Sequence, residues 1–177
     1  MSIRAFRGHH PTIAPGAYID PSAIVIGDVD IGADASLWPA VVARGDINRI
    51  RIGARSNIQD GTVLHVTHDS AFNPGGFALE IGAEVTVGHQ ALLHGCTIEH
   101  GCLIGMGAIV MDGAVLHSGL ILGAGSLVPP KRELEGGYLW LGRPVQRVRV
   151  LTDQERAHLA YVAEHYVRLK DEYRTAG

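Results

Sequence analysis

Aliphatic residues recur at every sixth position along most of the chain. Four runs carry this period, and every anchor position in them is Ile, Leu or Val. The anchors are, run by run, Ile13, Ile19, Val25, Ile31 and Leu37; Ile52, Ile58 and Leu64; Ile81, Val87 and Leu93; and Ile98, Ile104, Val110, Leu116, Leu122 and Val128. This period does not match the i, i+3, i+4, i+7 pattern of an amphipathic helix, so we expect short strands.

Small and turn-permissive residues recur between the anchors. The residue four positions after an anchor is usually Ala, Ser, Thr or Cys, with Leu120 the exception, and Gly often follows the anchor directly, as at Gly53 and Gly105. Such spacing describes short strands joined by tight corners. An ordinary β-sandwich with irregular strands is the alternative, and strict sixfold spacing over so many anchors disfavours it.

The repeat resembles the left-handed parallel β-helix of the hexapeptide-repeat superfamily. The resemblance implies an all-β solenoid with three flat faces and roughly 18 residues per coil. We expect this solenoid over residues 1–150. Residues 66–79 are predicted to be an inserted loop, because Leu64 and Ile81 are 17 positions apart where six are expected. An irregular link is predicted from about residue 129, where Pro and Gly pairs cluster.

The period changes near the C-terminus, within residues 151–177. Thr152 and Glu155 form a capping box. Apolar residues follow at helical spacing: Leu159, Val162, Tyr166, Leu169 and Tyr173. This pattern predicts an amphipathic helix from about residue 153 to 174, packed on the β-helix or on a neighbouring subunit. We expect a single domain with a helical appendage.

Composition narrows the class of protein. The chain has 46% hydrophobic residues, which disfavours disorder, and a formal charge of −3 without a basic cluster, which disfavours nucleic-acid binding. No run of 18 apolar residues is present, so no membrane span is expected. Two cysteines, Cys96 and Cys102, are too few for a disulfide framework, and the N-terminus has no apolar signal segment. We therefore expect a cytoplasmic protein.

Two histidines are predicted to stack on adjacent coils. His65 and His94 each follow an anchor directly, and they are 29 positions apart. That separation equals one coil plus the eleven inserted residues, so both side chains are expected on one face, about one strand spacing apart. Two imidazoles at this separation can converge on one zinc ion with bonds of about 2.0–2.1 Å.

A third histidine, His89, points to an oligomer. It precedes His94 by five residues of extended chain, which is a distance on the order of 15 Å. His89 of the same chain is therefore not expected to bind the same ion. A symmetric assembly brings His65 and His94 of one subunit against His89 of the next. Three neutral imidazoles with an open fourth position are typical of a catalytic zinc site.

Other polar residues follow the same coil spacing. Asp60 lies 29 positions before His89 and is expected to stack beside it, with Gln59 adjacent. Arg44 and Asp46 lie where the anchor spacing is disturbed, between Leu37 and Ile52, so the period does not assign their face. Together these residues would either position an anion or form a structural salt bridge at the subunit contact.

The chain resembles the gamma-class carbonic anhydrases in four segments: Arg44-Gly45-Asp46, residues 57–65, residues 88–96, and residues 137–144 with the terminal helix. The resemblance implies a homotrimer that converts carbon dioxide to bicarbonate. It implies zinc, or sometimes iron or cobalt, bound between subunits by His65, His89 and His94. Four further residues and a tyrosine of the helix are implied to organise the interface, the bicarbonate or the metal-bound solvent: Arg44, Asp46, Gln59, Asp60 and Tyr166.

The chain departs from well-developed family members at two acidic positions. Ile47 stands where those members carry a glutamate, and Asp69 is the one acidic residue of the predicted loop. Loss of a proton shuttle is expected to slow hydration. Three other functions remain as alternatives: a hexapeptide acyltransferase, a non-catalytic metal-binding or assembly protein, and a zinc thioesterase.

Overall fold

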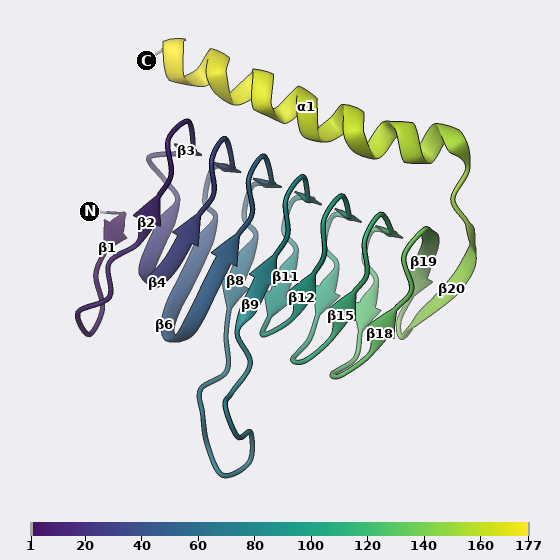
Figure 1. The fold of residues 1–177 in the computed structure, drawn as a ribbon, viewed down its shortest axis with the longest axis horizontal. Helices are drawn as coiled ribbons and strands as arrows, with labels where there is room; N and C mark the ends of the chain where they lie inside the picture. The colour runs from purple at the N-terminus through teal and green to yellow at the C-terminus, as the bar shows by residue number, and fades with distance from the viewer. Residues whose placement is uncertain (1, 177) are drawn as a thin grey trace.

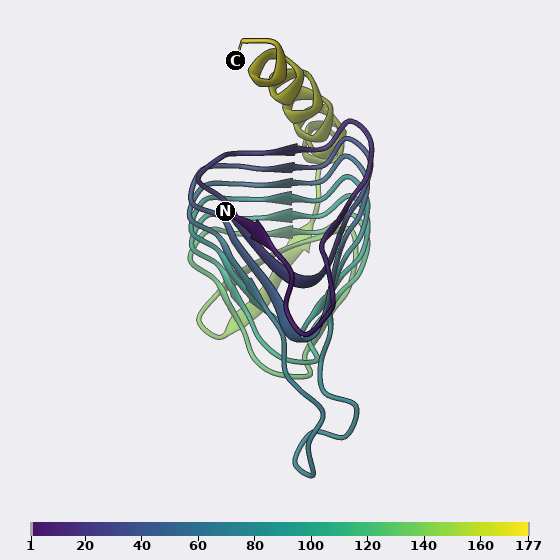
Figure 2. The same ribbon diagram turned by 90° about the vertical axis from the view of Figure 1, so that its left-hand side faces the viewer.

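The computed structural model describes residues 2–176, so Met1 and Gly177, at the ends of the predicted segments, lie outside the described residues. Short strands wind into a stack of triangular coils, and one long helix runs along the stack (Figures 1 and 2). Strands of successive coils pair in parallel register. The fold is the predicted left-handed parallel β-helix.

The strands form two sheets. The larger sheet wraps two faces of the prism and contains β1 Ile3–Arg4, β2 Thr12–Ile13, β4 Ile24–Ile31, β6 Val42–Ile52, β8 Val63–His65, β9 Leu79–Ile81, β11 Leu92–His94, β12 Thr97–Ile98, β14 Ile109–Val110, β15 Val115–Leu116, β17 Leu127–Val128 and β18 Glu133–Leu134. The smaller sheet forms the third face and contains β3 Tyr18–Ile19, β5 Ser36–Leu37, β7 Asn57–Ile58, β10 Thr86–Val87, β13 Leu103–Ile104, β16 Ile121–Leu122, β19 Tyr138–Gly142 and β20 Val145–Val150.

The sixfold anchors form the core of the prism. Val25, Leu64, Leu93 and Val110 are fully buried and lie in one column on one face, and the anchors of the other faces stack in the same way. Each short strand directs its anchor inward and the preceding residue outward, because successive side chains of a strand alternate. Ile13 is 40% exposed, since its coil lies at the end of the stack.

The region from about residue 129 is more regular than the predicted link. Strand β18 pairs with β15, and β19 pairs with β16 through Leu122 and Trp140. Leu134 and Trp140 are buried and continue the sixfold period of the preceding anchors, while the Pro and Gly pairs lie at the corners. The chain leaves the solenoid only afterwards, through the antiparallel pair of β19 and β20.

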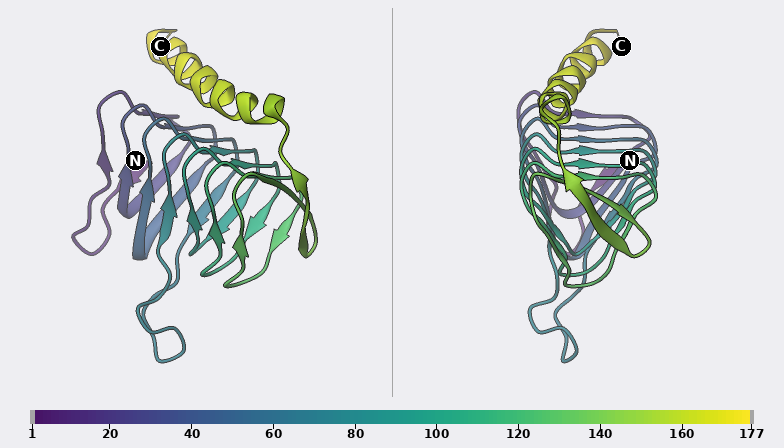
Figure 3. Two further views of the ribbon diagram at one scale, coloured as in Figure 1. Left: turned by 45° about the vertical axis from the view of Figure 1, so that its right-hand side comes forward. Right: turned by 90° about the vertical axis from the view of Figure 1, so that its right-hand side faces the viewer.

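The inserted loop projects from the edge of the prism opposite the helix-covered face (Figure 3). It is one residue shorter than the predicted 66–79, because the buried Leu79 begins β9. Thr67 and Phe77 pair at its base, each donating a backbone hydrogen bond to the other. The base of the loop is therefore ordered by backbone pairing.

Helix α1, Asp153–Ala176, lies along the face of the smaller sheet and contacts β3, β5 and β10. It begins at the predicted residue and extends two residues past the predicted end. The capping box is formed, because Glu155 N donates to Thr152 Oγ1 at 3.2 Å and Thr152 N donates to Glu155 Oε2 at 2.8 Å. No helix within residues 2–176 is long and apolar enough to cross a membrane.

Aromatic rings and one buried lysine fix the helix against the first coils. Trp38 packs against Tyr166 and Tyr173 with ring centroids 5.6 and 5.1 Å apart. The fully buried Lys170 pairs with Asp34 at 3.1 Å and with Asp171 at 2.5 Å. A buried ammonium group needs such partners, because it is otherwise strongly destabilised by loss of water. The apolar side of the predicted helix therefore packs on its own chain.

The helix N-terminus predicts a pH-dependent contribution to stability. The Arg149 hydrogen bonds, at 2.7 and 2.8 Å, together with those from Thr152, lower the pKa of Glu155 from 4.5 to about 2. Because the folded pKa is depressed, this contribution is present above pH 4.5 and is lost as the pH falls toward 2. Glu155→Gln is expected to lower the unfolding temperature at pH 7, with a difference that shrinks on acidification, followed by circular dichroism.

The matched control is Glu172→Gln, on the last turns of the same helix, which is expected to leave the unfolding temperature unchanged or slightly raised. A difference between wild type and Glu155→Gln that stays constant from pH 7 to pH 3 would contradict this account of the helix N-terminus.

Candidate metal centre

His65 and His94 lie one above the other at the ends of β8 and β11. The two residues are paired in register, together with Leu64 and Leu93. His65 Nδ1 lies 3.0 Å from His94 Nε2, and the ring centroids are 5.0 Å apart. The predicted stacking of these two residues is therefore confirmed by the structure.

Carboxylates hold the outer nitrogens of both rings. His65 Nε2 lies 3.1 Å from Asp46 Oδ1, and His94 Nδ1 lies 2.6 Å from Asp112 Oδ1. An ionised carboxylate accepts hydrogen bonds and cannot donate them. The outer nitrogens are therefore assigned as the protonated ones.

This assignment leaves a bare nitrogen on the inner side of each neutral ring. The lone pairs of His65 Nδ1 and His94 Nε2 then face each other at 3.0 Å. Two acceptors at this distance repel unless a proton or a cation lies between them. The pair is thus arranged to share a positive charge.

Burial and hydrogen bonding set the protonation of this cluster. Burial lowers the pKa of His65 below its usual value, against the opposing effect of Asp46. Burial favours a higher pKa for Asp46, but hydrogen bonds from Arg44 and His65 outweigh it and hold that pKa below its usual value. Arg44 Nη1 lies 2.6 Å from Asp46 Oδ2. A neutral His65 beside an ionised Asp46 is the ligand form of the imidazole.

His89 lies at a different corner, in the turn between β10 and β11. Its Nδ1 lies 2.8 Å from Asp60 Oδ2, as the stacking of Asp60 and His89 predicts. The side chains of His89 and Asp60 are 46% and 49% exposed. Within residues 2–176 of one chain, no group of three or more His, Cys, Asp or Glu side chains is arranged to hold a metal ion. The structure therefore groups His65 with His94, and keeps His89 apart.

A groove of about 470 Å³ opens beside His89, between the helix and the smaller sheet. Gln59 and Tyr166 line it together with aliphatic residues such as Leu103 and Ile121. Gln59 is almost fully buried, and its Nε2 donates to Asn57 Oδ1 at 3.1 Å. Burial, and secondarily the charge of Asp60, raises the pKa of Tyr166 above 10. Tyr166 is thus a neutral hydroxyl on the wall of this groove.

The three faces of the prism carry different outward side chains. On the face that ends in His65 and His94, paired outward positions form a row that we term the apolar ladder: Ile24, Val42, Val63, Leu92, Ile109 and Leu127. Val63 and Leu92 are each 39% exposed. The other four are partly exposed, and a continuous apolar row that is open to solvent beside polar residues is typical of an interaction surface.

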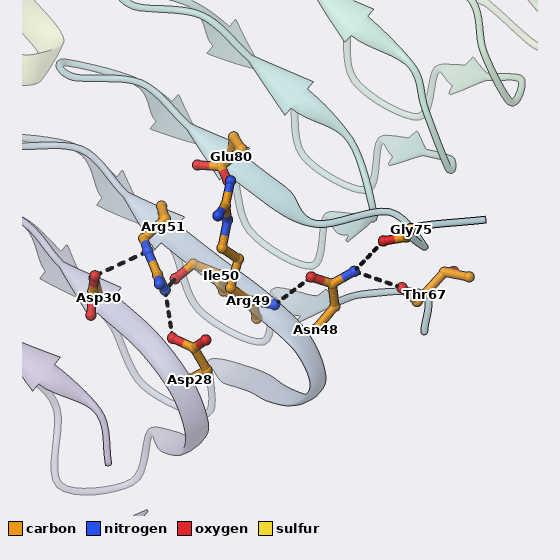
Figure 4. A network of polar contacts seen from close by, with 9 residues as sticks. All are labelled: Asp28, Asp30, Asn48, Arg49, Ile50, Arg51, Thr67, Gly75 and Glu80. Carbon is orange, nitrogen blue, oxygen red and sulfur yellow. Dashed lines mark hydrogen bonds and ion pairs between the residues drawn. The ribbon is translucent and has the colours of Figure 1, made fainter. Parts of the chain in front are cut away.

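The opposite flank of the larger sheet is polar. Its outward row includes Asp30, Arg51 and Glu80, which pair in register. Figure 4 shows the ion pairs there, with Arg51 Nε 3.0 Å from Asp30 Oδ2 and Arg49 Nε 2.9 Å from Glu80 Oε1. This flank is suited to solvent, in contrast to the apolar ladder.

Asp112 is a residue of this site that was not predicted from the sequence. This residue lies 18 positions after His94, which is one full coil, so the rule that pairs His65 with His94 also places Asp112 on that face. The structure also brings Arg44 and Asp46 to His65, which the disturbed spacing left open. The long strand β6 bends around the corner there, and a register shift against β4 accommodates the extra residues.

The comparisons with known proteins are decisive for the family. No family model matches the chain. Protein YrdA of Escherichia coli (strain K12) is 52% identical over 175 residues, covering 99% of this chain and 95% of that protein. Gamma carbonic anhydrase 2, mitochondrial, of Arabidopsis thaliana is 42% identical over 161 residues, covering 90% of this chain and 57% of that protein. The chain belongs to the hexapeptide-repeat family of β-helix proteins, and its relatives include gamma-class carbonic anhydrases.

Among solved structures, the chain resembles a hexapeptide transferase family protein from Anaplasma phagocytophilum, with a TM-score of 0.87, 40% identity and coverage of 96% of both chains. The relatives thus carry names from two reaction classes, anhydrase and transferase. Both kinds of relative support an enzymatic function for this chain.

Proposed function

We propose that this protein is a zinc-dependent enzyme that catalyses the reversible hydration of carbon dioxide to bicarbonate, at sites shared between the subunits of a homotrimer. The observation that carries this proposal is the pair of facing ring nitrogens of His65 and His94, 3.0 Å apart, with carboxylates on both outer nitrogens. A divalent cation turns this repulsive contact into an attractive one.

The donor set fits zinc. Two nitrogen ligands of a tetrahedral zinc ion with bonds of about 2.0–2.1 Å are roughly 3.3 Å apart, so the two rings need only a small adjustment. Imidazole ligands also suit iron and cobalt, which keeps both metals as alternatives. A third histidine would leave one position open for a substrate or solvent molecule.

The third ligand is assigned to His89 of a second copy. His89 is half exposed, its Nδ1 is engaged by Asp60, and its Nε2 is therefore the nitrogen available to a partner. The two halves of the site lie on different patches of the chain, so the contact is heterologous, the type of contact from which closed rings are built. Three subunits is the number that the family resemblance implies.

The apolar ladder supports the same assembly. It lies on the face that presents His65 and His94, and it has no helix over it, unlike the face of the smaller sheet. Burying this aliphatic row against another subunit is favourable by about 25 cal/mol for each Å² removed from water. The ladder would thus hold the two halves of the metal site together.

The remaining residues have roles that follow from their contacts. Zinc held by the three histidines would lower the pKa of water to about 7, and would so supply the nucleophile for hydration. Arg44 and Asp46 orient His65 through the ion pair and hydrogen bond described above. Asp60 orients His89, and Gln59 and Tyr166 offer hydrogen-bonding groups beside it.

A second candidate function is acyl transfer. The groove beside His89 is lined mainly by aliphatic side chains, which suits an apolar acyl group. His89, with its Nδ1 held by Asp60, is arranged as a general base toward that groove. Acyl transfer by His89 needs no metal ion, whereas hydration of carbon dioxide needs zinc. The dependence of activity on metal therefore distinguishes these two functions.

The proposed role of the apolar ladder predicts that the trimer depends on this row of side chains. Leu92→Asp places a charge at the centre of the proposed interface, where its burial without a partner would cost several kcal/mol. We expect the trimer to dissociate, measured by sedimentation velocity, with loss of bound zinc. Val115→Asp is the matched control, because Val115 is an outward residue of the polar flank in register with Thr97 and Glu133. A Leu92→Asp protein that remains trimeric would contradict the proposed interface.

The metal site predicts zinc-dependent activity. The purified protein is expected to contain about one zinc ion per chain and to accelerate carbon dioxide hydration in a stopped-flow assay. Chelation should abolish the activity and zinc should restore it. His89→Ala should lose both zinc and activity, whereas His117→Ala, at another corner and paired with Glu99, should keep both.

The other outcomes of this assay are distinct. Acetyl transfer from acetyl-coenzyme A by the metal-free protein would favour the second candidate. Thioester hydrolysis by the zinc form would indicate a thioesterase. Zinc binding with hydration at the buffer background would indicate a metal-binding or assembly protein, and retention of zinc by His89→Ala would remove the proposed ligand set.

A further inference from the structure

Asp112 uses both carboxylate oxygens beside the proposed metal site. Oδ1 accepts from His94 Nδ1 at 2.6 Å, and Oδ2 accepts from Thr67 Oγ1 at 2.9 Å. A carboxylate held on both oxygens has little freedom to rotate. Its position therefore sets the orientation of the His94 ring.

Thr67 is itself fixed, because it lies at the base of the inserted loop. Its backbone pairs with Phe77 in both directions, at 3.0 and 2.9 Å. Asn48 Nδ2 donates to Thr67 O at 3.0 Å and to Gly75 O at 3.4 Å, which ties the loop to β6 (Figure 4). The threonine hydroxyl is thus presented to Asp112 by backbone pairing on one side and a side-chain clamp on the other.

Close packing on the side of Gly95 limits where this carboxylate can lie. A Cβ atom on Gly95, which has a φ of +51°, would lie 2.4 Å from Asp112 Oδ1 and 2.7 Å from Phe77 Cβ. Gly95 directly follows His94, so the backbone at the metal site, the loop and Asp112 meet at this glycine. Only a residue without a side chain permits the approach.

We propose that Asp112 is a positioning residue of the metal site, and that Thr67 couples the base of the inserted loop to it. Asp112 keeps the proton of His94 on Nδ1, so that Nε2 faces His65 and the incoming ion. The loop is then a structural part of the metal site. This inference rests on the proposed function, because it concerns the affinity of the site for zinc.

The test is the zinc affinity of the intact protein, measured by competition with a chromophoric chelator. Asp112→Ala is expected to weaken zinc binding by about 10–100-fold, the usual effect of removing a carboxylate that supports a histidine ligand. Asp112→Asn, which retains an acceptor oxygen, should be weakened less. Thr67→Val should also weaken binding, and cobalt-substituted Asp112→Ala should show an altered visible spectrum.

Two controls separate positioning from structural support. Asp69→Asn changes an aspartate within the loop, which accepts from Gly75 N, and Thr97→Val changes a threonine on the polar flank. Both should leave zinc affinity unchanged. The metal-free Asp112 and Thr67 variants should unfold at the wild-type temperature. If Asp112→Ala fails to fold, Asp112→Asn and Thr67→Val carry the test.

Failure of this inference can be distinguished from failure of the proposed function. Wild-type zinc affinity in Asp112→Ala and Thr67→Val would overturn this inference and leave the proposed function standing. A wild-type protein that binds no zinc would overturn both. Weaker zinc binding accompanied by an equal loss of stability in the metal-free form would also overturn the positioning role.

Discussion

The register between stacked coils is the constraint on which the rest of the structure depends. Backbone hydrogen bonds hold each strand about 4.8 Å from its neighbour, so residues one coil apart lie against each other. Leu64 and Leu93 meet in the core by this rule, and His65 and His94 meet beside them. The eleven-residue insertion leaves the register intact, because the chain leaves the prism after β8 and returns to it at β9, at the same edge. Asp60 with His89, and His94 with Asp112, obey the same rule.

The same register gives the three faces their different roles. Outward positions repeat down each face, so one face is apolar, one is largely polar and one lies under the helix. The apolar ladder has its polar counterpart in the row containing Arg51 and Glu80, and the smaller sheet lies under the helix. The histidine pair lies at the edge of the apolar face, so a subunit that covers this face also approaches the proposed metal site. The proposed trimer uses the uncovered face whose outward row is apolar.

Much of this arrangement can be read from the sequence, because a solenoid converts sequence spacing into spatial contact. The anchors, the helix start at Asp153 and the stacking of His65 on His94 all follow from counting. The link from about residue 129 was predicted to be irregular because Pro and Gly pairs suggest a break, yet Leu134 and Trp140 continue the period. The contact of Asp46 with His65 was not predictable, since it depends on the bend and register shift of β6.

The most direct test of the shared site is a mixture of two variants that each lack one half of it. His89→Ala and His94→Ala proteins, each unable to hold zinc alone, are refolded together at equal amounts. A site between subunits predicts recovery of zinc binding in roughly a quarter of the sites, the fraction that random assembly of a closed ring produces. Mixed trimers that recover no zinc, while a wild-type protein treated in the same way does, would contradict the account.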